Sequence, residues 1–210
     1  LGTNSVTAFV QGKGIVFSES TAICYDAYDN EIICVGNKAG EMFEKAPYNI
    51  EIVFPMKEGV ISRFYDMQYL LQNLLKKEHH FARGSKYVIA VPTDVTEVEK
   101  KAFYDLVIHS TAKAKEVRIV ERGLADAVGL GLDVKNSPGI FIVNFGGETT
   151  ELSVLASGGM VLNRILKIGG NTLDQSIVSN IRYNKDFLIG RVTAENLRKY
   201  FGIFLLLTGL

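Results

Sequence analysis

The chain has 210 residues, of which 47% are hydrophobic and 22% are charged. This composition is that of a globular protein with a core of its own, and it excludes an intrinsically disordered chain. The 23 basic and 23 acidic residues balance to a net charge of zero, which argues against a strongly basic nucleic-acid-binding protein, so we expect no nucleic-acid partner.

The first third of the chain predicts strands joined by tight turns. Hydrophobic and β-branched residues form four short segments of this kind, at 6–10, 15–17, 21–25 and 32–35. Cys24 and Cys34 lie on either side of a predicted turn and could face each other across a hairpin. No CxxC motif or cluster of histidine and cysteine accompanies them, so we expect no metal site. We expect both side chains to stay thiols, as in a reducing cytosol.

Helical patterns follow. A short helix is predicted over 38–45, because the chain meets a proline shortly afterwards. Hydrophobic residues at helical spacing predict an amphipathic helix over 65–78. Thr96 and Glu99 form a capping box, which predicts the start of a further helix that runs to about residue 110.

Apolar runs at 87–91 and 140–143 predict strands that are buried on both faces. The remaining strands are predicted at 117–120, 152–156 and 160–168, and the remaining helices at 124–130, 172–181 and 193–200. Two successive units of strands followed by helices indicate an α/β fold with a pseudo-repeat. We expect a first subdomain over 1–136, with a small insertion at about 24–64, and a second subdomain over 137–210.

The longest apolar run of the chain is Ile203–Leu207. A helix that spans a bilayer needs about 20 apolar residues, so we expect this run to be a strand or a buried stub. The chain opens without the basic and apolar segments of a signal peptide. These observations favour a cytoplasmic protein.

Two turns carry residues suited to holding an anion. The first is the Leu-Gly-Thr-Asn-Ser sequence at 1–5, and the second follows the apolar run at 140–143 and covers 144–151. Backbone N–H groups and hydroxyls in such turns can bind phosphate oxygens, and glycine lets the anion approach the backbone. Either turn taken alone is equally a hairpin turn that needs glycine for its backbone conformation. A third turn at 169–171, with Asp174 after it, has the same character.

Several segments resemble the MreB family of bacterial actin homologues. They occur in the family's order and spacing, at 1–5, 12–16, 55–61, 91–102, 146–151, 166–174 and 189–195. The resemblance covers nearly all of residues 1–202. It implies an actin-like (ribonuclease H-like) ATPase fold, in which two related α/β subdomains close on a nucleotide, and the second of these is incomplete here.

The resemblance implies a cell-shape-determining cytoskeletal protein that binds ATP with Mg²⁺ and forms filaments that guide cell-wall synthesis. It implies self-association, contacts with the wall-synthesis machinery and a peripheral position at the inner membrane surface. The positions that it places at the phosphates are Thr3, Asn4, Ser5, Gly146, Gly147 and Glu148, and those that it places by the purine and ribose are Glu195, Asn196, Leu197 and Arg198. This hypothesis requires residues 2–5 and 146–149 to share one cleft.

Three residues depart from the family pattern. Asn144 replaces the aspartate of the second phosphate loop and so lacks the charge that would steady a water on Mg²⁺. Glu148 replaces a glycine, and its charge repels a triphosphate. Arg122, next to Glu121, stands where the family has the glutamate that orients the attacking water, and a guanidinium cannot accept a proton.

Because of these departures, we assign no catalytic residue. They favour an alternative, a pseudo-ATPase scaffold of the same fold that binds nucleotide weakly and hydrolyses little. A chaperone-type member of the wider superfamily is a further alternative, against which the segments at 55–61 and 91–102 weigh.

Overall fold

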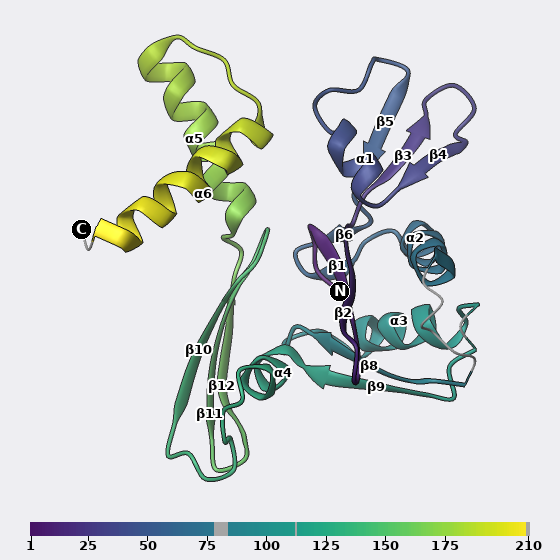
Figure 1. Ribbon diagram of the computed structural model, residues 1–210, viewed down its shortest axis with the longest axis vertical. Helices are drawn as coiled ribbons and strands as arrows, with labels where there is room; N and C mark the ends of the chain where they lie inside the picture. The colour runs from purple at the N-terminus through teal and green to yellow at the C-terminus, as the bar shows by residue number, and fades with distance from the viewer. Residues whose placement is uncertain (78–83, 112, 209–210) are drawn as a thin grey trace.

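A computed structural model describes residues 1–77, 84–111 and 113–208. Its elements fall into four groups, which Figure 1 shows at the four corners of the molecule. The chain passes from the group that holds β1 and β2 to the small sheet at the upper right, and returns to the first group. It then continues into the long hairpins at the lower left and ends in two helices at the upper left.

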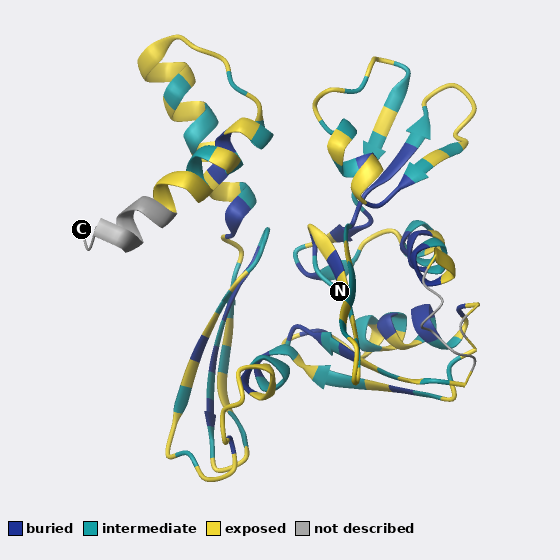
Figure 2. Ribbon diagram, viewed as in Figure 1, coloured by how far each residue is buried: buried dark blue, intermediate teal, exposed yellow. Residues whose placement is uncertain are grey.

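The first group contains two pairs of strands and two helices. Its elements are β1 (Ser5–Val10), β2 (Gly14–Ser20), α2 (Phe64–Lys77), β8 (Lys86–Val91), α3 (Glu97–Ile108) and β9 (Glu116–Glu121). The β1–β2 pair is antiparallel and the β8–β9 pair is parallel. The main core lies between the strands and the helices, with Phe103, Leu70 and Met67 fully buried (Figure 2).

Local sequence signals explain where the two helices of this group lie. The predicted capping box is present, since Glu99 N–H donates to the hydroxyl of Thr96 and the Glu99 carboxylate accepts from the Thr96 N–H. Helix α2 has its apolar stripe on the core side, as its 3.6-residue spacing predicts. The last residue of the helix predicted at 65–78 lies outside the described residues.

The second group is the small three-stranded sheet. Its elements are β3 (Ile23–Asp26), β4 (Ile32–Val35), α1 (Asn37–Met42) and β5 (Ile50–Val53), and the strand order is β4-β3-β5. Cys24 lies directly opposite Cys34 in the β3–β4 register, and both are free thiols. The chain returns from this sheet through the short hairpin of β6 (Met56–Lys57) and β7 (Val60–Ile61).

The third and fourth groups follow in sequence. The elements are α4 (Arg122–Gly129), β10 (Ile140–Phe145), β11 (Thr150–Ala156), β12 (Gly159–Leu166), α5 (Gly170–Lys185) and α6 (Arg191–Thr208). The three strands form an antiparallel meander. Its core is small and is built by Ala127 of α4 with Ile142 and Leu155 of the sheet.

The structure corrects the expectation that two strands are buried on both faces. In β8 the side chains of Ile89 and Val91 enter the core, but Val88 points away and is 67% exposed. In β10 Ile142 is buried, whereas Phe141 is 65% exposed. An apolar run does not distinguish a strand covered on both faces from one covered on a single face, and here the helices cover one face only.

The expectation for Ile203–Leu207 is also wrong. This run is neither a strand nor a stub but the last part of helix α6, which continues to Thr208. Leucine is a strong helix former, and extending an existing helix costs far less than nucleating a new element. No helix within the described residues is both long enough and apolar enough to cross a membrane.

Candidate functional site

The turn at 1–5 is fixed by a bond within the turn and by bonds to two other segments. Gly2 N–H donates to the carbonyl of Ser5 over 2.9 Å, and the Thr21 hydroxyl donates to the carbonyl of Gly2. The Thr3 side chain is buried, and its hydroxyl accepts from the N–H of Gly59 over 3.1 Å. The loop is therefore held in one shape before any ligand binds.

The second turn is tied to the start of helix α5. The N–H groups of Gly170 and Asn171 donate to the carbonyls of Gly146 and Gly147, over 2.9 and 2.7 Å. Glycine at 169 is required by this contact, because a Cβ there would lie 2.6 Å from the carbonyl carbon of Gly147. Two glycine turns that look separate in the sequence thus form one bonded unit.

The two loops meet directly. The side-chain amides of Asn4 and Asn171 donate to each other's oxygens, over 2.8 and 3.1 Å. A Cβ at Gly147 would lie 2.5 Å from the side chain of Asn4, so the second loop packs against the first. The segments at 2–5 and 146–149 therefore lie in contact, on the same side of the molecule, although residues 2–5 do not line the cavity described below.

A third contributor was not foreseen as part of the site. The tip of the β6–β7 hairpin consists of Glu58 and Gly59, which both have positive φ, 50° and 85°. Their N–H groups point to the other two loops, since Glu58 N–H donates to the Glu148 carboxylate over 2.6 Å and Gly59 N–H donates to Thr3. The Glu-Gly dipeptide between short apolar segments is the sequence signal that predicts such a hairpin.

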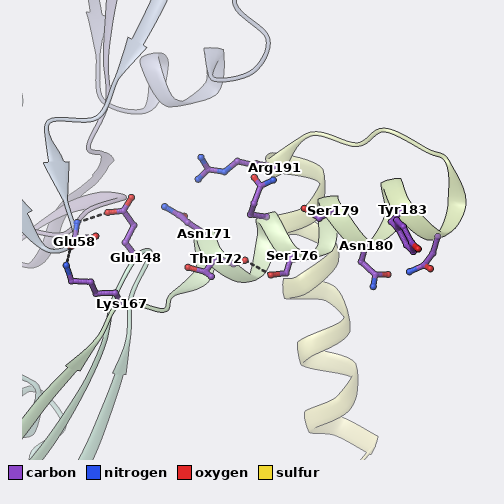
Figure 3. A pocket seen from close by; sticks show the side chains of 12 residues that line it. Glu58, Glu148, Lys167, Asn171, Thr172, Ser176, Ser179, Asn180, Tyr183 and Arg191 are labelled. Atoms are coloured by element: carbon purple, nitrogen blue, oxygen red, sulfur yellow. Dashed lines mark hydrogen bonds and ion pairs between the residues drawn. The ribbon is translucent and has the colours of Figure 1, made fainter.

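An open cavity of about 850 Å³ begins at this meeting point (Figure 3). Glu58, Glu148 and Lys167 lie at one end, and Figure 3 shows the polar face of α5 along its length. All twelve lining residues carry polar or charged side chains, and eight of them belong to α5. Such a lining suits a polar, charged ligand rather than an apolar one.

A contact between the second and fourth groups lies beside the cavity. Arg191 N–H donates to the Glu44 carboxylate over 2.6 Å, and the Arg191 guanidinium lies 5.2 Å from the centre of the Phe43 ring. A Cβ at Gly190 would meet the same carboxylate at 2.7 Å. The segment after α1 therefore rests against the start of α6.

The residues expected by the purine and ribose lie on α6, and none of them lines this cavity. Arg198 forms an ion pair with the buried Asp174 of α5, with its Nε 2.7 Å from one carboxylate oxygen. This hydrogen bond raises the pKa of Arg198 further above its usual range. Glu195 pairs with Lys199 on the same helix, while Asn196 is exposed and Leu197 is half-buried.

The residues that depart from the family pattern all have partners of their own. Arg122 lies 3.8 Å from the buried carboxylate of Glu151 and donates to the carbonyl of Leu1. Asn144 donates its amide to Asp126 on α4 over 2.6 Å, so it is turned away from the two loops. Glu121 precedes α4 and is exposed, and its side chain does not cap the helix.

The geometry accommodates a polyphosphate better than a metal ion alone. The Asn4 side chain lies against Gly147 of the second loop and is bonded to Asn171, and the Thr3 hydroxyl is bonded to the β6–β7 hairpin, so polar groups of several loops meet here. No group of three or more His, Cys, Asp or Glu side chains arranged to hold a metal occurs in the parts of the chain that the structure describes. The polar groups gathered here are of the kind that bind phosphate, and the amide of Asn144 is bonded to Asp126.

Two α/β halves around a paired set of glycine loops define the class of actin-like ATPase folds, and comparison with solved structures agrees. MreB5 of Spiroplasma citri, in crystal structures bound to ADP and to AMPPNP, superposes with TM-scores of 0.87 and 0.86 at 32% identity. These matches cover 94% and 95% of this chain, and 59% and 60% of the solved chains. The chain of the MamK double helical filament, at 20% identity and a TM-score of 0.76 over 96% of this chain and 63% of that one, shares the fold.

The family follows from the sequence match. The model of the MreB/Mbl protein family matches residues 1–207, so the chain belongs to the MreB/Mbl family. The cell shape-determining protein MreB of Escherichia coli strain K12 is 34% identical over 209 residues, which cover 96% of this chain. The chain spans 60% of the length of that relative. Membership of this family rules out the chaperone-type alternative.

Proposed function

We propose that this chain is the nucleotide-binding part of an MreB-like cell-shape-determining protein, and that it binds adenine nucleotide between residues 2–5 and 146–149. The observation that carries this proposal is the reciprocal amide pair of Asn4 and Asn171, which closes the two loops on each other. The ADP and AMPPNP bound by MreB5, a structural neighbour at 32% identity, support the choice of ligand.

In this proposal the first loop contributes Thr3, Asn4 and Ser5 to the phosphates. The second loop contributes Gly146 and Gly147, with Glu148 at its edge. The start of α6, at 195–198, lies by the purine and ribose, and Asp174 fixes the position of Arg198 there. The division of the chain into subdomains at 136–138 belongs to the same proposal, because it places one loop in each half.

We propose further that hydrolysis is slow, so that the pseudo-ATPase alternative describes the chemistry of this chain. Arg122 is held by Glu151 and Asn144 is held by Asp126, and neither side chain is free to act as a base or to place a water. Bound Mg²⁺ would supply charge neutralisation of the phosphates when the nucleotide carries it, but this chain contributes few ligands to it.

The proposal includes self-association into filaments, a cytoplasmic position at the inner membrane surface, and contact with the cell-wall synthesis machinery. Support for filaments comes from the family and from the filament that MamK forms on the same fold. The contacts with membrane and wall machinery rest on the family resemblance.

Calorimetric titration with ADP and ATP, each with and without Mg²⁺, tests nucleotide binding. A phosphate-release assay and light scattering with electron microscopy test hydrolysis and assembly. We expect binding, very slow phosphate release, and nucleotide-dependent filaments. A rate of phosphate release equal to that of an active MreB would contradict the pseudo-ATPase proposal. If neither ADP nor ATP binds, the proposed function as a whole is contradicted.

A further inference from the structure

The tip of the β6–β7 hairpin is a small anion-accepting surface that faces the cavity. Of its two successive N–H groups, that of Glu58 donates to Glu148, which lines the cavity, and that of Gly59 donates to the buried hydroxyl of Thr3. The ammonium of Lys167 lies beside them, 2.6 Å from the Glu58 carboxylate. Successive N–H groups at a turn are a recurrent way for proteins to bind anions.

A carboxylate of the chain itself already occupies this surface. Glu148 reaches from the second loop, and its Oε2 accepts the Glu58 N–H over 2.6 Å, the short distance expected of a charged acceptor (Figure 3). Glu148, Glu58 and Lys167 all line this end of the cavity, and Glu58 is bonded to both of the others. The side chain therefore crosses from one half of the molecule to the other.

We propose that the Glu148 carboxylate is a built-in anion that stands in the place of a nucleotide's terminal phosphate, so that the cleft takes a nucleoside diphosphate in preference to a triphosphate. The proposal rests on the nucleotide binding proposed above and assigns its selectivity. A terminal phosphate that accepts the Glu58 N–H must displace the Glu148 carboxylate from it, whereas a diphosphate leaves this hydrogen bond in place.

The charges around Glu148 support this selectivity. The adjacent ammonium of Lys167 is paired with Glu58, and the hydrogen bond between them lowers the pKa of Glu58, which keeps that carboxylate charged as well. A terminal phosphate would thus approach two carboxylates and one ammonium. Repulsion between unit charges a few ångströms apart at a protein surface is large enough to change an affinity by tenfold or more.

The test compares the dissociation constants of ADP and ATP for the whole chain and for Glu148→Gln, which removes the charge and keeps the side-chain length. We expect the unaltered chain to bind ADP at least about tenfold more tightly than ATP. In Glu148→Gln the affinity for ATP should rise about tenfold while that for ADP stays within about twofold. Glu116→Gln, at the other end of β9 from Arg122, removes the same charge far from the cavity and should change neither value.

A second readout follows the hairpin itself. The ¹⁵N–¹H resonance of Glu58 should move when ATP displaces the carboxylate, and it should stay in place when ADP binds. This inference is overturned if ADP and ATP bind with equal affinity to both forms of the chain, or if ATP binds and leaves the Glu58 resonance unmoved. The proposed function still stands in that case, provided that ADP binds. If neither nucleotide binds to either form of the chain, both this inference and the proposed function are overturned.

Discussion

Asn4 and Asn171 are 167 positions apart in the chain, yet their side-chain amides form a reciprocal pair of hydrogen bonds. One residue belongs to the turn before β1 and the other to the first turn of α5. The pair is the direct polar bond between the glycine loops of the two halves, and several measurable consequences follow from it.

The first consequence concerns coupling between the two asparagines. In a double-mutant cycle of Asn4→Ala and Asn171→Ala, we expect a coupling energy of about 0.5–1 kcal/mol, because the pair is exposed and water replaces the lost bonds. Urea unfolding of the four forms measures it. Strictly additive effects would mean that the pair does not hold the loops together in solution.

The two close-packed glycines should respond differently to alanine. At Gly169 an added Cβ meets the backbone of Gly147, which cannot move aside, so Gly169→Ala should cost about 2 kcal/mol or more. At Gly147 the Cβ meets only the side chain of Asn4, so Gly147→Ala should cost about 1 kcal/mol.

The background variant Asn4→Ala separates these two cases. It removes the atoms that an alanine at 147 would meet, so it should relieve most of the cost of Gly147→Ala and none of the cost of Gly169→Ala. Urea unfolding again provides the measurement. Equal relief at both positions would show that the loops are not packed in this manner.

Arg122 should be structural rather than catalytic. Glu151 is 2% exposed and accepts bonds from Thr93 and Asn163, and Arg122 is its ion-pair partner. Removing the cation leaves a buried carboxylate uncompensated, so Arg122→Gln should lower the free energy of unfolding by about 3 kcal/mol.

The matched control is Arg118→Gln, which removes an exposed arginine from the preceding strand and should change stability by no more than about 0.5 kcal/mol. Adding Glu151→Gln to Arg122→Gln should recover part of the loss, since no buried charge then remains. A loss of phosphate release without a loss of stability would instead indicate a catalytic arginine.

Cys24 should make the protein sensitive to alkali. Burial, and then the hydrogen bond with Cys34, raises the pKa of the Cys24 thiol from 9.0 to about 11. The protonated thiol is the neutral form, so its contribution to stability is complete below about pH 9 and is lost as the pH rises through 11. We expect a loss of about 2 kcal/mol between these values, measured by urea unfolding.

Two variants assign that loss to its source. Cys24→Ala should flatten the profile between pH 9 and 10. Tyr25→Phe should leave the profile below pH 10 unchanged, because burial and the bond to Asp66 raise the pKa of Tyr25 from 10.0 to about 12, so its effect falls between pH 10 and 12. An unaltered slope in Cys24→Ala would contradict the assignment.

Local chemistry explains why much of the fold could be predicted from the sequence. The capping box of Thr96 and Glu99 and the apolar stripe of α2 depend on residues within a few positions of each other, and both are present. The proximity of the two glycine loops was expected from the family resemblance alone, because either loop by itself is only a turn, and the loops are in contact. The run at 203–207 was misjudged because a short apolar run does not by itself distinguish a strand from a helix.

The details of the site depend on partners that no local pattern connects. Asn144 is 18 positions from Asp126, and Glu148 is 90 positions from Glu58, so the sequence identifies both residues as departures without indicating where they point. The sequence also gives no sign that Glu58 and Gly59 join the cleft, since their spacing predicts only a hairpin.

Strand β10 lies at the edge of its sheet and carries Phe141, Val143 and Phe145 on one exposed face. An unpaired strand edge with an exposed hydrophobic surface promotes non-specific association between copies of the chain. A sedimentation assay of this chain would therefore pellet amorphous aggregates as well as ordered filaments. Only pelleting that responds to nucleotide, and that survives the replacement of Phe141 by a charged residue, reports ordered assembly.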